Sequence, residues 1–175
     1  MFDSFYPFYC VGYKKSELKG EIIGIRYFSF KTASFRYIVE VEYYPNDFHV
    51  IQYYTTKYKN HPKKFQIMTH EFKCRKIIGT CVKIMYGVWM KNPIASFGFV
   101  GANTYDPITK KEEPIDNTKR WRVYTHAMEN YFGTNTFKHG FQSHNSSYSL
   151  LNKKNDVEKL DKEVNELFAR LYEKH

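Results

Sequence analysis

The chain has 175 residues, of which 42% are hydrophobic and 19% aromatic. This length and composition can bury one core, which excludes an intrinsically disordered protein and predicts a single domain over residues 1–175. No apolar run has the length of a membrane span, and the first residues lack a basic segment followed by an apolar one. We therefore expect neither a membrane segment nor a signal peptide. The three cysteines have no disulfide spacing, which favours free thiols and a cytoplasmic protein.

The net charge of +9 lies mostly in the first half of the chain. Up to Asn92 there are 15 basic and 7 acidic residues, and after it there are 12 basic and 11 acidic ones. A basic field of this kind attracts polyanions such as nucleic acid, acidic lipid or a phosphate-rich cofactor. It is equally typical of a surface that uses lysine only for solubility.

The first 92 residues predict an aromatic arm, three strands and a helix. Residues 1–19 are expected to dock on the core as an irregular arm, before strands at 21–30, 34–44 and 48–59. Apolar and polar residues alternate along 34–44, and the connections are short, so these strands should form an antiparallel meander. Apolar spacing then predicts a helix over 69–90, which Asn92-Pro93 ends.

The remaining residues predict one buried strand, a helix, two strands and a last helix. The uncharged run 94–102 suits a strand buried on both faces. A helix follows over 117–133 with Asn117 as N-cap, and then strands at 136–142 and 146–152. The last helix spans 155–174, with Asn155 as its cap and Glu158 completing a capping box. The chain therefore predicts a mixed α/β fold with one mixed central sheet and helices on both faces.

Two groups of side chains carry metal-ligand chemistry. His70, Cys74 and Cys81 fall on one face of the helix predicted over 69–90, and His139 lies near His144. Apolar residues share the face with the cysteines and neither group completes four ligands, so we expect no metal site.

Basic and aromatic residues alternate where the third predicted strand meets the first helix. The basic members are Lys57, Lys59, Lys63, Lys64, Lys73, Arg75 and Lys76. Positive side chains at a helix N-terminus suit phosphate groups, and interleaved aromatic rings suit a nucleic-acid backbone with stacked bases. A solvated loop explains the same residues without a ligand.

The element order resembles the core of the GNAT (GCN5-related N-acetyltransferase) fold over residues 20–152. The segment Asn117–Tyr124 is similar to the family's helix motif N-x-x-A-x-x-[LF]-Y. The resemblance implies binding of acetyl-CoA or another acyl-CoA beside Asn117, with Tyr124 as general acid to the CoA thiolate. The segment S-F-G-F-x-G-A-N, with N-T-K-R downstream, also resembles a group of small uncharacterised bacterial proteins.

The chain departs from the family pattern at three points. The region matching the family's pyrophosphate loop, Phe65–Arg75, contains no glycine, so phosphate would meet side-chain charge on Lys63, Lys64, Lys73 and Arg75 instead. Arg120 replaces the usual small residue of the helix motif. No carboxylate lies on the third predicted strand, so His49 is the expected general base, with Glu42 of the neighbouring strand as a second candidate.

The sequence leads to a hypothesis and two alternatives. The hypothesis is an N-acyltransferase that uses acyl-CoA and an amine substrate, provided that a diphosphate has room after the third strand. The first alternative is a non-catalytic basic module that binds nucleic acid or a protein on the same fold. The second is an interaction protein, of host or phage, whose last helix pairs with a partner through its apolar stripe.

Overall fold

The computed structural model describes residues 4–16 and 21–173, except for the side chains of 172 and 173. These residues form one seven-stranded sheet, three α-helices and two short 3-10 helices. The strands are β1 (Phe8–Lys15), β2 (Gly24–Lys31), β3 (Arg36–Tyr44), β4 (Phe48–Thr55), β5 (Ser96–Val100), β6 (Phe137–Gln142) and β7 (Ser147–Asn152). The helices are α1 (Cys74–Lys91), α2 (Lys119–Tyr131) and α3 (Val157–Glu173), with 3-10 turns at Thr56–Tyr58 and Ser143–Asn145.

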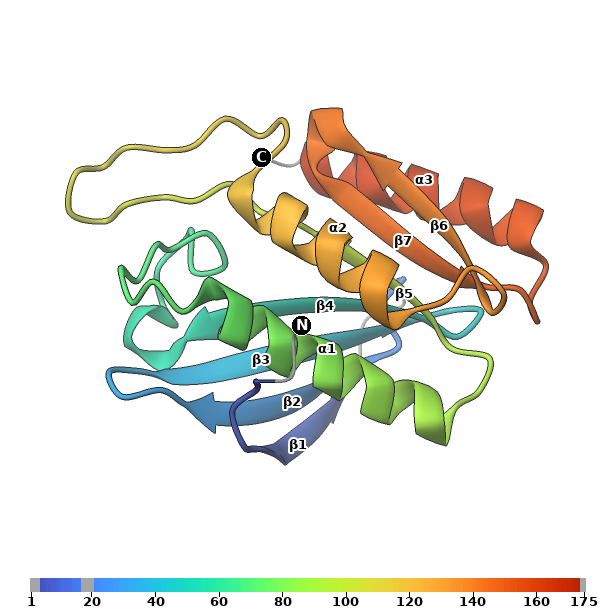
Figure 1. Cartoon of the computed structure of the whole chain (residues 1–175), viewed down its shortest axis with the longest axis horizontal. Coiled ribbons are helices and arrows are strands. Elements are labelled where there is room, and N and C mark those ends of the chain that lie inside the picture. The colour runs from blue at the N-terminus through green and yellow to red at the C-terminus, as the bar shows by residue number, and fades with distance from the viewer. Residues whose placement is uncertain (1–3, 17–20, 174–175) are drawn as a thin grey trace.

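The sheet is mixed, with the strand order β1-β2-β3-β4-β5-β7-β6. Strands β4 and β5 run parallel, and every other neighbouring pair is antiparallel. The parallel pair is joined through α1, because two parallel neighbours need a long crossover connection. The mixed α/β fold expected from the sequence is confirmed at this level (Figure 1).

Helices cover both faces of the sheet (Figure 1). Figure 1 shows α1 and α2 on the near face and α3 behind β6 and β7. Tyr37, Val39 and Val41 of β3 join the larger core cluster, to which α1 and α2 contribute. Tyr44, on the opposite face, joins the smaller cluster with Phe168 of α3.

The N-terminal arm is more regular than the sequence predicted. Residues Phe8–Lys15 form β1, which pairs antiparallel with β2 with a register shift between Cys10 and Gly12. Tyr6 docks on the core as expected, because its ring stacks on Phe30 at a centroid distance of 5.5 Å. Polar and apolar residues alternate only weakly along the arm, so the sequence did not indicate a strand. The strand forms because the edge of β2 is available for pairing. Residues 1–3 and 17–19 of the predicted arm lie outside the described part.

Helix α1 begins at Cys74 and not at residue 69. His70 and Phe72 have φ angles of 56° and 54°, which an α-helix cannot contain. The Glu71 side chain holds this turn, since its two oxygens accept hydrogen bonds from Thr32 and Tyr37 at 2.5 Å each. Contacts with β3 and the preceding loop therefore override the apolar spacing that predicted a longer helix.

The predicted helix caps are each one residue early. Thr118, not Asn117, caps α2, and its hydroxyl accepts a hydrogen bond from the Trp121 backbone N–H at 3.2 Å. Asp156 accepts from the Lys159 backbone N–H at 3.2 Å before α3, where the sequence favoured Asn155. A cap residue needs one particular backbone geometry, and the sequence alone does not show which of several neighbouring Asn, Asp or Thr residues adopts it.

Among the described helices, none is apolar over enough length to cross a bilayer.

Candidate functional site

A cavity opens where the parallel strands β4 and β5 separate. The two strands pair only where Phe48–Val50 of β4 lies beside Ser96–Gly98 of β5. Beyond this point β4 continues beside β3 and β5 continues beside β7. The cavity at this divergence has a volume of about 340 Å³. Its lining includes Ile51, Gln52 and Tyr53 of β4, Val100 at the end of β5, Ala102 and Asn103 after that strand, and Arg120 and Tyr124 of α2. This volume is in the range of small-molecule sites.

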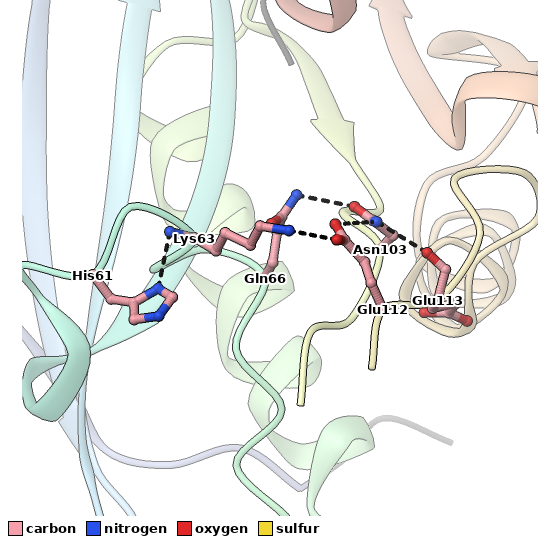
Figure 2. A network of polar contacts seen from close by, with 6 residues as sticks. All are labelled: His61, Lys63, Gln66, Asn103, Glu112 and Glu113. Atoms are coloured by element: carbon pink, nitrogen blue, oxygen red, sulfur yellow. Dashed lines mark hydrogen bonds and ion pairs between the residues drawn. The ribbon is translucent and has the colours of Figure 1, made fainter. Parts of the chain in front are cut away.

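Two loops close one side of the cavity through a polar network centred on Asn103 (Figure 2). The Asn103 amide accepts a hydrogen bond from Gln66 at 3.0 Å, and it donates to the Glu112 carboxylate at 2.8 Å and the Glu113 carbonyl at 3.0 Å. Lys63 forms an ion pair with the other oxygen of Glu112. The network therefore ties the loop before α1 to the loop before α2.

Arg120 crosses from α2 to the loop before α1. Its guanidinium donates to the backbone carbonyls of Phe65 and Ile67, the second at 3.0 Å, and lies 4.9 Å from the centre of the Tyr53 ring. The residue is only 9% exposed and lines the cavity. The residue that departs from the family motif therefore places a buried positive charge in the divergence of the two strands.

Glu42 places a buried carboxylate on the α3 face of the sheet, opposite the face from which Arg120 reaches the cavity. It is 8% exposed, and it accepts hydrogen bonds from the Tyr44 hydroxyl at 2.8 Å and the Gln52 amide at 2.7 Å. Burial raises the pKa of this carboxyl, and the Tyr44 hydrogen bond opposes part of that rise. Lys64 forms an ion pair with the neighbouring Glu40 at 3.3 Å, and its charge has only a minor lowering effect on the pKa of Glu42.

Tyr124 is the motif residue that the structure brings to the cavity. Its ring is 2% exposed and stacks on Phe99 at a centroid distance of 4.1 Å. Burial raises the pKa of this phenol well above its ordinary value, so the hydroxyl stays protonated at neutral pH. It also interacts with the Cys81 thiol, whose pKa burial raises to about 12. Tyr124 is therefore a neutral hydrogen-bond donor.

His49, the expected general base, lies in the core. It is 2% exposed, and its Nδ1 lies 3.1 Å from the Ser96 carbonyl oxygen. Its ring packs against Tyr43 and Phe97 at the closed end of the β4–β5 pair. Burial lowers the pKa of His49, and the residue is not among those that line the cavity. Glu42, the second candidate, does line the cavity.

The expected cofactor-binding residues separate into two groups. Lys63 lines the cavity but is paired with Glu112, and Lys64 is paired with Glu40. Lys73 occupies the N-cap position of α1 and Arg75 its first turn, where both are exposed outside the cavity lining.

Two further residues, Asn117 and Phe72, are not among those that line the cavity. Asn117 is exposed in a left-handed conformation with φ 50° just before α2. Phe72 is 94% exposed. Phe65 does line the cavity, and the Lys64 ammonium lies 4.5 Å from the centre of the Phe65 ring.

The segment S-F-G-F-x-G-A-N and the downstream N-T-K-R have a structural role. A Cβ atom at Gly101 would lie 2.5 Å from the Trp121 backbone nitrogen, so only glycine lets β5 approach the start of α2. Thr118 seals this contact, because its hydroxyl donates to the Gly101 carbonyl. Asn103 then anchors the network described above. These residues shape one end of the cavity.

The described residues contain no group of three or more His, Cys, Asp or Glu side chains that could hold a metal ion. Comparisons of the chain with protein-family models, with curated proteins and with solved structures found no match.

Proposed function

We propose that this protein is an N-acyltransferase that takes the acyl group from an acyl-CoA and transfers it to an amine held in the cavity. One observation carries the proposal: β4 and β5 diverge beside Tyr124, and the cavity at the divergence holds the buried carboxylate of Glu42. The strand order and the segment Asn117–Tyr124 support a GNAT-like arrangement of these parts.

The residues of the cavity suit a thioester donor and an amine acceptor. A bound acyl-CoA would supply an acyl group activated as a thioester. Glu42 would accept the proton that the substrate ammonium loses, and its raised pKa brings it closer to the working pH of a general base. Tyr124 lines the same cavity and would act as general acid, giving its phenolic proton to the departing CoA thiolate. Lys73 and Arg75, exposed at the start of α1, would meet the phosphates.

Acetyl-CoA binding and turnover test the proposal directly. Titration calorimetry of the full chain with acetyl-CoA should give saturable heat, and a thiol-release assay with an amine panel should give turnover. Glu42→Gln should lower the rate by about 10²–10⁴-fold and leave acetyl-CoA affinity unchanged. Glu166→Gln, at an exposed position of α3, is the matched control. Absence of acetyl-CoA binding would overturn the acyltransferase proposal.

Three of the basic residues between Lys57 and Lys76 are already engaged by other side chains, which favours this function over a nucleic-acid-binding one. Lys63 and Lys64 are paired with carboxylates, and Lys57 lies 5.7 Å from the Phe35 ring centre and 5.3 Å from that of Tyr58. Basic side chains engaged in this way offer less charge to a phosphate backbone. A salt series of oligonucleotide binding checks the point: we expect weak binding with a shallow dependence on salt.

A further inference from the structure

Two buried charges of opposite sign line the cavity without a charged partner of their own. Glu42 is 8% exposed and Arg120 is 9% exposed. The ion pairs of the described residues include neither of them. Charged groups removed from water are normally paired, because an isolated charge in a protein interior is strongly destabilising. Each group is therefore a candidate to bind a ligand of the opposite charge.

The hydrogen bonds of the two groups leave room for such a ligand. The Glu42 carboxylate accepts one hydrogen bond at each oxygen, from Tyr44 and from Gln52, although it can accept about four. The Arg120 guanidinium has five N–H donors, of which the Phe65 and Ile67 carbonyls occupy two. Both groups are held in place by these contacts, so a ligand would meet fixed partners.

The two charges enter the cavity from opposite faces of the sheet. The Glu42 side chain shares the α3 face with Tyr44, whereas Arg120 comes from α2 on the other face. The cavity passes between them, since residues of both faces of β4 line it, including Val50 and Ile51. A ligand that spans the cavity therefore meets a carboxylate at one end and a guanidinium at the other.

We infer that the cavity binds a small zwitterion of the amino-acid class, with its ammonium group at Glu42 and its carboxylate at Arg120. One part of the inference rests on the proposed function, namely that this zwitterion is the amine to which the acyl group is transferred. Binding itself requires no acyl donor. A guanidinium binds a carboxylate through two parallel hydrogen bonds, which gives the Arg120 end its selectivity.

Titration calorimetry in the absence of acyl-CoA tests the inference. The probes are γ-aminobutyrate and its longer ω-amino acid homologues, each with the diamine and the dicarboxylate of equal chain length. We expect one amino acid to bind at least about tenfold more tightly than both of its matched compounds, because each of those leaves one protein charge unpaired. The inference is overturned if none of the amino acids binds, or if a matched diamine or dicarboxylate binds as well.

Variants assign the two ends. Glu42→Gln keeps the shape of the side chain and should weaken the amino acid and the diamine by about tenfold or more, but not the dicarboxylate. Arg120→Met should weaken the amino acid and the dicarboxylate instead, and circular dichroism checks that the variant folds. If Glu42→Gln weakens all three compounds alike, or none of them, the assignment of the ends is wrong even if Arg120→Met fails to fold. Glu166→Gln is again the control.

The results separate the two proposals. If amino acids bind with the expected pattern and acetyl-CoA does not bind, the zwitterion site stands and the acyltransferase proposal fails. If acetyl-CoA binds and other amines are acylated while no zwitterion binds, the reverse holds.

Discussion

The two halves of the β4–β5 pair contain similar residue types but differ in what fills the space between the strands. At the closed half, His49 and Phe97 lie in register, and their rings pack at a centroid distance of 5.5 Å. At the open half, the strands part, and Arg120 and Tyr124 of α2 reach the cavity between them. The difference shows that backbone pairing leaves no room for side chains of α2 in one half, while its absence admits them to the other.

The consequence is a division between stability and chemistry. The closed half contributes apolar burial, which stabilises the fold. The open half holds the buried charges of Glu42 and Arg120, which cost stability unless a ligand or the surrounding dipoles compensate them. Changes in the closed half should therefore act mainly on unfolding, and changes in the open half mainly on loops, pH dependence and binding.

The largest expected effect is at the closed half. Phe97→Ala removes a ring that is fully buried between His49 and Phe132, and should lower the free energy of unfolding by about 3–5 kcal/mol. Chemical denaturation measures it. Ile108→Ala, at a side chain that is 80% exposed, should stay within about 0.5 kcal/mol of the wild type. Similar losses in both variants would contradict the division.

A smaller effect is expected from the network at the open half. Asn103→Ala removes three side-chain hydrogen bonds and should cost about 1–3 kcal/mol. Hydrogen exchange should become faster at the backbone N–H of Met68 and of Tyr105, which bond between the two loops. Exchange within α3 serves as the internal control. Unchanged protection of both loops would show that the backbone bridges hold them without Asn103.

The Glu42 carboxyl gives the comparison a pH dependence. Because burial raises its pKa above the ordinary value of 4.5, the folded protein binds the proton more tightly than the unfolded chain does. The contribution of this raised pKa to the free energy of unfolding is fully present below pH 4.5, and it is lost as the pH rises through the folded-state pKa. The advantage of Glu42→Gln over the wild type should therefore grow from about pH 4.5 upward and then level off. Thermal unfolding across pH measures it, and a constant difference would contradict the cause.

The smallest effect is expected at the rim of the cavity. Lys63→Met removes a partly exposed ion pair with Glu112, which should contribute about 0–1 kcal/mol. The loss should shrink further at high salt, because screening weakens the pair in the wild type too. Denaturation at low and high salt checks this. A loss of several kcal/mol would place Lys63 among the residues that hold the loops.

Much of the secondary structure could be predicted, because local patterns decide it. The alternation along β3 assigned Tyr37, Val39 and Val41 to one face correctly, and the uncharged run around Phe97 marked a strand buried on both faces. The start of α1 could not be predicted in this way. Glu71 holds the preceding turn through Thr32 and Tyr37, which are more than 30 residues away in sequence.

The candidate site was only partly readable for the same reason. The motif spacing pointed to Tyr124, which lines the cavity. Of the two candidate bases, His49 lies in the core and Glu42 lines the cavity. Gln52 had no sequence signal, because its role follows from its register opposite Glu40 and its bond to Glu42.

By itself the sequence determined the apolar faces of the main elements, where most helices and strands lie, and that polar residues such as Glu42 fall on strands. These follow from apolar periodicity and backbone preferences, which act over a few neighbouring residues. Only the tertiary structure decided where β4 and β5 part and that Glu42 and Arg120 enter one cavity. That outcome depends on how α2 and two distant loops pack around the point where β4 and β5 separate. Contacts between distant segments leave no local pattern in the chain.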